Sequence, residues 1–415
     1  MIGGDHRGAM PSDARPTIPR SATIAIATAF FVNGATFSSW IPRLPEIRDR
    51  LGVSETGLGI TLVGAGVGGL VASVFSGVLV DRFGSRTMTV GTSLLLSALL
   101  PLVALASVPA MLFAGLVAIG AADGLTDVSM NSQAVILQRS RPKRLMSRMH
   151  GMWSLGMVLG GAVASRAAAA GVTLRTQLLL TSVVLMVVMI TLRRWLIFTC
   201  GHEHSAAAVV DAPFGDGALR SDDGAGASAR PRRRPSTRIL ARLFVIGAAV
   251  TLSEFPGSDW SSVMWSNRFG LSEGQAALGF VSFATGMFVG RFFGDPVVDR
   301  LGPHRVKRIS GSMAVVGIVV AATAPEPWPL SGLGLFATGL GVSSVFPLVF
   351  AASAAMTPGT SRGMSAFSSG TRMGILASAP LIGVISGRAT VAIAMMCVVG
   401  VAGLVIAVVP LHPPD

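Results

Sequence analysis

The sequence predicts an all-α membrane protein with twelve transmembrane helices in two pseudo-symmetric six-helix bundles. Of its 415 residues, 51% are hydrophobic and only 13% are charged, which is too apolar for a soluble protein of this size. The apolar residues gather into twelve separate runs, and a helix needs about 20 such residues to cross a bilayer. A motif that follows the second run returns after the eighth, which indicates an internal duplication.

The predicted helices span residues 21–41, 58–80, 87–106, 109–137, 146–168, 174–192, 239–265, 274–298, 309–324, 329–352, 365–386 and 389–409. The first run is full length and follows a polar tail without a cleavage-like flank, so we expect it to remain as a helix and not to be removed as a signal peptide. The predicted organisation is a tail over 1–20, a first bundle over 21–192, a linker over 193–238, a second bundle over 239–410 and a tail over 411–415.

Lys and Arg residues predict the orientation of the chain. With the N-terminus inside, about 25 of the 33 basic residues fall in inside segments and about 7 in outside segments, with Arg291 inside a helix. Cytosolic loops are enriched in Lys and Arg, so we expect a plasma-membrane protein with both termini in the cytosol. The formal net charge of +13 follows from the same rule and requires no nucleic-acid partner.

The linker is rich in Gly, Ala, Ser and Pro, as in SDDGAGASARPRRRPSTR, and is predicted to be disordered. Its basic cluster suits membrane lipid with anionic headgroups. Only two cysteines occur, so the sequence implies no disulfide framework or metal cluster. The glycine-rich run GAGVGG is not followed by the Lys and Ser or Thr of a P-loop. Nucleophile triads and cofactor motifs are missing as well, and we expect no enzymatic activity and no cofactor.

A loop motif occurs once in each half of the chain. GVLVDRFGSR follows the second predicted helix, and GDPVVDRLGPHR follows the eighth. The two copies contain Gly77, Asp81, Arg82, Gly84 and Arg86, and Gly294, Asp299, Arg300, Gly302 and Arg305. Asp81 and Asp299 are 218 residues apart, and so are the starts of the first and seventh helices at 21 and 239. SRMHGMWSLG and SRGMSAFSSG form a second pair, so an internal duplication of six helices is the economical explanation.

The duplicated loop is a candidate cytosolic gate. Asp81 is expected at the C-terminal end of its helix, where the helix dipole disfavours an anion, so its stabilising partner should lie on another helix. Such a contact can break and form again as two bundles rock. Arg291 and Asp295 stand four residues apart near the cytosolic end of the eighth helix. A local ion pair would reduce the cost of placing both there, and we assign them to the second gate.

These loops resemble the signature of the major facilitator superfamily, G-x-x-x-D-R-x-G-x-[RK] between the second and third helices, with a weaker copy between the eighth and ninth. The first copy is complete, whereas the second has Asp295 in place of the first glycine. Helix number, loop spacing and the central linker agree with this family over essentially the whole chain. The resemblance implies a transporter with a central cavity between two bundles, which works by alternating access.

Four further segments are similar to the YbjJ-like branch of that superfamily, which is related to the fucose-permease type. They are FFVNGATFSSWIPRLPEIRDRLG, TDVSMN, SEFPGSDWSS and GMFVGRFFGD. The substrate of this branch is poorly defined, so the resemblance implies architecture and transport but not the solute.

The segment DGLTDVSMN places two carboxylates inside an apolar run. On a helix, Asp123, Asp127 and Asn131 stand at i, i+4 and i+8 and share one face. An ionised side chain near the bilayer centre costs roughly 2.5 to 3.5 kcal/mol, so such groups should face a cavity or a partner. In the seventh helix, Glu254 falls near the middle of the membrane and Asp259 more than a turn towards the outside. Carboxylates from both halves are therefore expected near the middle of the membrane.

Asp127 and Glu254 are the foremost candidates to bind a proton or a hydroxyl or amine of a solute, because a carboxylate withdrawn from water can exchange its proton. Asp123 and Asn131 are further candidates on the same face as Asp127. The alternative is that these three residues of the fourth helix only tie it to a neighbouring helix or an arginine.

Two more polar residues complete the set of candidates. Asn33 adds a neutral hydrogen-bonding group on the first helix, and an ordinary interhelical contact is an equal alternative for it. Asp259 stands next to Trp260, so it equally suits the outer membrane interface, where tryptophan is common.

The expected function is secondary transport of a small solute by a monomer. Without an ATP-binding motif we expect ion coupling, and isolated acids suit protons. The direction stays open. Uptake of a polar, sugar-like solute follows from the fucose-permease relation, and export of a drug or metabolite is the alternative within the same fold. A membrane sensor that no longer transports is the alternative from a different class.

Overall fold

The computed structural model describes residues 18–140, 145–198, 236–325, 328–357 and 362–411, and within them it contains helices and no strand. The first bundle consists of α1 (Arg20–Ser38), α3 (Glu55–Phe83), α4 (Ser85–Leu99), α5 (Pro101–Leu105), α6 (Pro109–Arg139), α7 (Met146–Ala169) and α8 (Leu174–Leu192). The second consists of α10 (Thr237–Phe269), α11 (Glu273–Phe293), α13 (Pro303–Thr323), α14 (Pro329–Val342), α15 (Val345–Met356), α16 (Arg362–Ser386) and α17 (Val391–Val408). Shorter helices are η1 (Ile41–Arg43), α2 (Leu44–Leu51), η2 (Arg193–Trp195) and α12 (Asp295–Leu301). The predicted tails and linker lie mostly outside the described residues.

Each of the twelve predicted apolar runs lies in helical structure, which confirms the all-α fold. Ten described helical segments are long and apolar enough to cross a membrane. The two predicted helices outside this set are α7 and α16, and each packs against the other bundle, α7 on α11 and α16 on α3. Because part of their surface meets protein and not lipid, these helices can carry polar residues at membrane depth.

Three predicted helices are interrupted. Pro101 starts α5 within the third, since proline has no N–H for the helix ladder. The tenth is divided between α14 and α15. The eighth was expected to reach residue 298, but α11 ends at Phe293, and α12 begins at Asp295 with a proline in its first turn. This last break lies between Arg291 and Asp295 of the predicted second gate.

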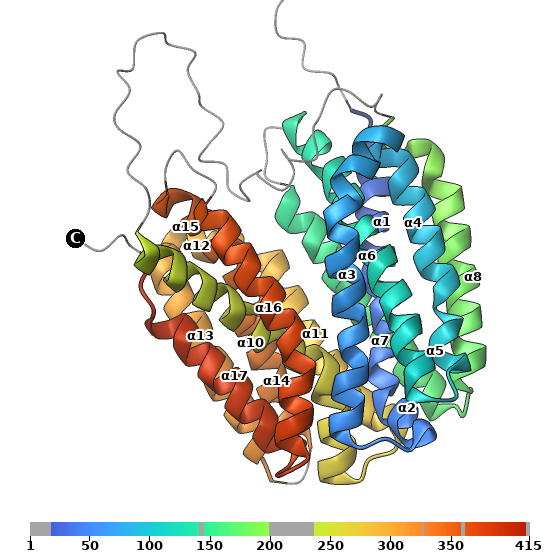
Figure 1. Ribbon diagram of the computed structural model, residues 1–415, viewed down its shortest axis with the longest axis vertical. Coiled ribbons are helices and arrows are strands. Elements are labelled where there is room, and N and C mark those ends of the chain that lie inside the picture. The colour runs from blue at the N-terminus through green and yellow to red at the C-terminus, as the bar shows by residue number, and fades with distance from the viewer. Residues whose placement is uncertain (1–17, 141–144, 199–235, 326–327, 358–361, 412–415) are drawn as a thin grey trace, which may run out of the picture.

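The two bundles lie side by side (Figure 1), and α7 packs on α11 from Gly161 against Phe280 to Gly151 against Phe292 near α12. They come together where α2 lies and diverge toward the end where α12 and α15 lie. The first of these is named the α2 end below and the second the α12 end. Helix α6 runs from the α2 end to the α12 end, so each turn after Pro109 lies closer to the α12 end.

Matching glycine contacts relate the two bundles. A Cβ at Gly34 of α1 would collide with the backbone carbonyl of Trp153 in α7, and one at Gly247 of α10 would collide with that of Phe367 in α16. Likewise, Gly120 of α6 lies against the carbonyl of Ala65, and Gly339 of α14 lies against that of Phe283. Small residues permit such close helix approach in membranes. These pairs fix which positions correspond in the two repeats.

Polar contacts tie the bundles together at the α2 end. Arg48 donates from Nη1 to Asn267 Oδ1 at 2.7 Å, and Asn267 donates from Nδ2 to Glu55 Oε1 at 3.1 Å. Thr56 donates from Oγ1 to the carbonyl of Gly383 at 2.8 Å. The starts of α3 and the ends of α10 and α16 are therefore joined across the interface.

Arg43 of η1 is the most buried cation at this end, with 3% of its side chain exposed. Its Nη1 donates to Gln177 Oε1 at 2.9 Å, and its Nε lies 2.6 Å from Glu46 Oε2. Its Nη2 lies 3.5 Å from Glu273 Oε2 at the start of α11, in the other bundle. The Arg43 guanidinium thus binds polar groups of the first bundle and also contacts the second.

Candidate functional site

A chain of polar side chains crosses from one bundle to the other in the middle of the molecule. Asn33 of α1 donates from Nδ2 to Asp123 Oδ1 of α6 at 2.8 Å. Trp153 of α7 donates from Nε1 to Asn33 Oδ1 at 2.7 Å. The guanidinium of Arg291, on α11 of the second bundle, lies over the Trp153 ring, 5.2 Å from its centroid. The same guanidinium reaches Glu254 of α10, so the chain has a carboxylate at each end.

Arg291 has partners in both bundles. Its Nη2 lies 2.9 Å from Glu254 Oε1, and 15% of each of these two side chains is exposed. Its Nη1 donates to Ser154 Oγ of α7 at 3.2 Å, and its Nε donates to the carbonyl of Ser343 at 3.4 Å. Charged groups at membrane depth are expected to pair in this way, because an isolated one is costly.

The predicted ion pair between Arg291 and Asp295 is wrong. Helix α11 ends at Phe293, so the two residues do not lie on one continuous helix and the spacing of four does not align them. Asp295 instead accepts a hydrogen bond from Ser147 Oγ at the start of α7, at 3.1 Å. Both members of the expected pair thus contact the first bundle.

The fold itself does not require this polar chain. The glycine contacts align Asn33, Asp123 and Trp153 of the first repeat with three positions of the second. The second repeat has apolar side chains there, each at most 1% exposed: Ile246, Val342 and Phe367. Helices of the same arrangement therefore pack with a purely apolar set. The polar set in the first bundle points to a function and not to folding alone.

Asp127 and Asn131 lie outside this chain. Asp127 Oδ1 accepts from Asn131 Nδ2 at 2.9 Å, within the same helix, and this is its only side-chain bond among the described residues. Its side chain is exposed, one turn closer to the α12 end than Asp123. Of the predicted acids, the structure joins Asp123 and Glu254 in one chain, and leaves Asp127 accessible from the α12 end.

Asp259 lies on α10 and is half-buried. Within the described parts of the chain it makes no hydrogen bond or ion pair. Its neighbour Trp260 is fully buried, and the Trp260 Nε1 has no hydrogen-bond partner there. The structure therefore brings Asp259 to none of the other candidate acids.

The duplicated loops form two similar tight turns. Gly84 has a φ of 80° after α3, and Gly302 has a φ of 77° after α12, conformations that favour glycine. Arg86 donates from Nε to the carbonyl of Arg193 at 2.9 Å, which attaches the first loop to η2. The remaining predicted gate residues surround these turns, with Arg82, Asp299 and Arg300 exposed, and Gly77 and Asp81 half-buried.

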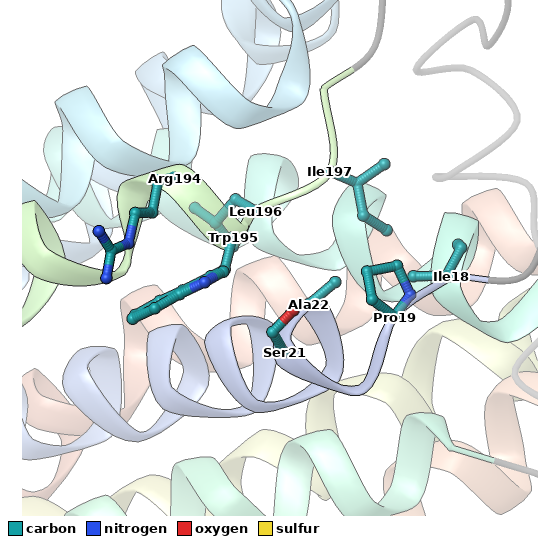
Figure 2. Close-up of a pocket in the computed structure, with 8 residues that line it drawn as sticks. All are labelled: Ile18, Pro19, Ser21, Ala22, Arg194, Trp195, Leu196 and Ile197. Atoms are coloured by element: carbon teal, nitrogen blue, oxygen red, sulfur yellow. The ribbon is translucent and has the colours of Figure 1, made fainter.

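A cavity of about 300 Å³ lies away from the central chain, between the start of α1 and η2. Figure 2 shows Arg194 beside Trp195 at its edge, and the guanidinium lies 4.3 Å from the indole centroid. Pro19, Ala22 and Leu196 give it a largely apolar lining. The residues that line it include no carboxylate, which distinguishes it from the site between the bundles.

Sequence reasoning did not identify Trp153, Ser154 or Ser343 as site residues. Trp153 entered only through the repeat motif SRMHGMWSLG. The available signal was its depth, because tryptophans of membrane helices are usual at the interfaces, and one far inside a span needs a partner for its N–H. The partners of Arg291 gave no comparable signal, since they come from α7, from α10 and from the turn between α14 and α15.

Comparison with known proteins agrees with this architecture. The Major Facilitator Superfamily model matches residues 26–262 and 243–415. An uncharacterized MFS-type transporter of Yersinia pestis is 27% identical over 379 residues, 91% of this chain and 92% of the relative.

Two solved structures show the same fold. The human organic anion transporter MFSD10 has a TM-score of 0.64 at 14% identity, covering 93% of this chain and 98% of the other. The transporter FucP, in the outward conformation, has a TM-score of 0.57 at 16% identity, covering 92% and 97%. The chain therefore belongs to the Major Facilitator Superfamily, and it is a multi-pass membrane transporter of a small molecule and not an enzyme.

Proposed function

We propose that this transporter moves a small polar solute by alternating access and couples that movement to protons. The observation that supports this most is the chain from Asp123 through Asn33 and Trp153 to Arg291 and Glu254. It lies between the bundles, where a solute in a central cavity would contact both. It has a carboxylate at each end, Asp123 and Glu254, and these are the candidate proton-carrying groups.

The contacts between the bundles support a state that is closed at the α2 end. Arg48, Asn267 and Glu55 bridge the interface there, and Arg43 reaches Glu273. Toward the α12 end the bundles diverge, and Asp127 is exposed. A transporter that alternates would break the contacts at the α2 end and bring the α12 ends together.

Protonation of Glu254 would couple to these movements through Arg291. A protonated Glu254 no longer holds the guanidinium by charge, and the same guanidinium contacts Ser154 and Trp153 in the other bundle. Loss of the carboxylate therefore changes a contact across the interface. Asp123 has no cation beside it among the described residues, so the hydrogen bond that it accepts from the Asn33 amide is what orients it.

The test is solute uptake and proton flux in proteoliposomes with an imposed pH gradient, using labelled sugars, amino acids and organic cations. Asp123→Asn and Glu254→Gln should abolish solute-dependent proton flux. Asp127→Asn should reduce the rate less, because Asp127 is exposed and bonded within its own helix. Arg175→Gln is the control, since that side chain is exposed at the start of α8. Unchanged flux in both Asp123→Asn and Glu254→Gln would refute the assignment.

The proposed location is the plasma membrane, with both termini and the α12 end in the cytosol, because Lys and Arg concentrate in the segments predicted on that side. Single cysteines test the orientation. In a cysteine-free chain, Asp49→Cys should react with an impermeant maleimide added to intact cells, and Asp299→Cys only after permeabilisation. The opposite pattern would invert the topology.

The YbjJ-like, fucose-permease-related branch is proposed from the sequence motifs, and it favours uptake of a sugar-like solute. Export of a drug or metabolite is the competing direction. Inverting the imposed pH gradient in the same proteoliposomes distinguishes the two, because a proton symporter accumulates solute on the side toward which protons flow.

A further inference from the structure

Two membrane-spanning helices carry two carboxylates each. Asp123 and Asp127 on α6, and Glu254 and Asp259 on α10, all lie within membrane-spanning helices. Among the described residues, Glu254 is the one of these four that pairs with a cation, Arg291. A carboxylate without a counter-charge within a membrane span is costly. A proton can neutralise such a group, but a solute that carries positive charge can do so as well.

The surroundings of Arg291 form a recognition site for a cation. The guanidinium faces a carboxylate at 2.9 Å, the hydroxyl oxygen of Ser154 at 3.2 Å and a backbone carbonyl at 3.4 Å. The face of the Trp153 ring lies 5.2 Å away. Hydrogen-bond acceptors combined with an aromatic face select guanidinium and ammonium groups over neutral or anionic ones. Both bundles contribute to this set.

The Trp153 ring is held in place for this contact. Its Nε1 donates to Asn33, and Asn33 in turn donates to Asp123, so the first bundle orients the indole through two hydrogen bonds. Ser154, beside it, is fully buried. The cation contact in the first bundle is therefore built in advance and does not depend on flexible side chains.

Arg291 itself is not required by the fold. Gly68 of α3 lies against the carbonyl of Val117, and Gly286 of α11 lies against that of Phe336, which aligns these two helices of the repeat. In that register the position of Arg291 corresponds to Ser73. The first repeat thus places a small neutral side chain where the second places an arginine.

We infer that the transported solute is a small organic cation, with a guanidinium or ammonium group, and that Arg291 occupies the position of that group when the site is empty. The inference rests on the proposed function, since it names the solute class of the same site. An arriving cation takes the place of the Arg291 guanidinium at Glu254 and over Trp153. The displaced arginine then loses its bond to Ser154 and one contact across the interface, which links solute binding to movement of the bundles.

Binding to the purified full chain in lipid nanodiscs tests this without requiring transport. The probes are agmatine and choline as cations, xylitol as a neutral polyol and gluconate as an anion, measured by calorimetry and by the shift in Tm. The cations should bind and raise the Tm, and the other two should do neither. Glu254→Gln should abolish cation binding. Trp153→Leu should weaken it, whereas Trp153→Phe, which keeps an aromatic face, should retain most of it.

Arg291→Gln gives the sharpest result, because removal of an internal competitor should tighten cation binding. If Arg291 fills the site about nine-tenths of the time, its loss raises the apparent affinity about tenfold. Arg308→Gln, on an exposed surface of α13, should leave the affinity unchanged. Arg291→Lys provides a second variant if the first does not fold. It keeps the charge without the planar fork and should tighten binding by less than tenfold.

Two results would overturn the inference. Gluconate binding that disappears in Arg291→Gln would make Arg291 an anion ligand, and weaker cation binding in that variant would make it a partner and not a competitor. The outcomes separate from those of the proposed function. Proton-coupled uptake of a neutral solute, with no cation binding, retains the proposed function and rejects the cation. Cation binding with no transport of any solute would retain the cation site and reject the proposed transport function.

Discussion

Asn33 determines the arrangement of the candidate site at the level of single residues. Its amide donates to Asp123 and accepts from Trp153, so one buried side chain, 3% exposed, satisfies a carboxylate and an indole on two other helices. Amides suit this position because they carry both a donor and an acceptor. The corresponding position of the second repeat is Ile246, which can do neither.

A pair of substitutions separates function from folding at this position. Asn33→Ile should lower the Tm, because the Asp123 carboxylate loses its donor, and an unsatisfied buried group costs about 1–3 kcal/mol. Asn33→Ile with Asp123→Val introduces the residues of the second repeat and should recover part of the Tm, because both partners become apolar. Solute transport should be absent in both variants. Transport by the double variant, or equal Tm values, would contradict a functional role for the pair.

At the level of elements, close helix contacts hold the polar chain in register. Gly156 of α7 lies against the backbone of Phe31 in α1, three positions from Trp153 and two from Asn33. This approach sets the distance between the two helices that carry the tryptophan and the amide. The same pattern in α10 and α16 supports an apolar set of side chains, so the packing and the polar chemistry are separate properties of the sequence.

Gly156→Ala tests that packing. The added Cβ would meet the carbonyl of Phe31, and overpacking of this kind costs about 1–3 kcal/mol. We expect a lower Tm and weaker transport, because α7 must move away from α1. Gly91→Ala is the control, since a Cβ there meets no atom within 4 Å, and alanine is the better helix former. Gly91→Ala should leave the Tm equal or higher. A similar fall in Tm in both variants would argue against a role for the close approach of α7 to α1.

The turn between α3 and α4 allows a test of the gate. Asp81 lies in the last turn of α3, before Gly84. Asp81→Asn removes the charge that a latch at the α12 end requires, so transport should slow while solute affinity stays largely intact. Initial rates measure the speed of transport, and equilibrium binding measures the solute affinity. Asp299→Asn makes the same change in the second copy of the loop for comparison. A loss of binding without a change in rate would contradict the latch.

At the level of the whole molecule, the sequence predicted the helices and the duplication better than the site. Apolar runs reveal helices because each span must cross the same thickness of hydrocarbon. The two D-R-x-G loops mark equivalent turns of the two repeats. Asp123 and Glu254 were also recognisable, because carboxylates are rare in such runs. Their connection was not recognisable. Asp123 and Trp153 lie 90 and 120 residues after Asn33 in the chain, and the three meet only through helix packing.

Arg291 shows the limit of local spacing most clearly. A spacing of four residues pointed to Asp295, but the end of α11 at Phe293 removes the shared helical face. Its partner Glu254 lies 37 residues earlier in the chain, on another helix. Spacing on one helix predicts an ion pair only while that helix continues. The Gly-Asp-Pro sequence after Phe293 was the available sequence signal for this helix end.

A reversible cross-link at the α2 end tests alternating access of the whole molecule. A Cβ built at Gly387, after α16, lies 2.7 Å from Thr56 Oγ1 on α3, so cysteines at these positions are within reach of a disulfide. In a chain with Cys200→Ser and Cys397→Ser, oxidation of Thr56→Cys/Gly387→Cys should stop transport, and reduction should restore it.

The disulfide would join the two bundles where Thr56 already contacts Gly383, and it would prevent opening at that end while leaving the α12 end free. Each single cysteine should transport equally with and without oxidant, which controls for damage by the reagent. Solute binding from the α12 side should survive oxidation, because the site between the bundles stays accessible from there. Continued transport by a fully cross-linked chain would require a route that does not open the α2 end, and would rule out alternating access between the two bundles.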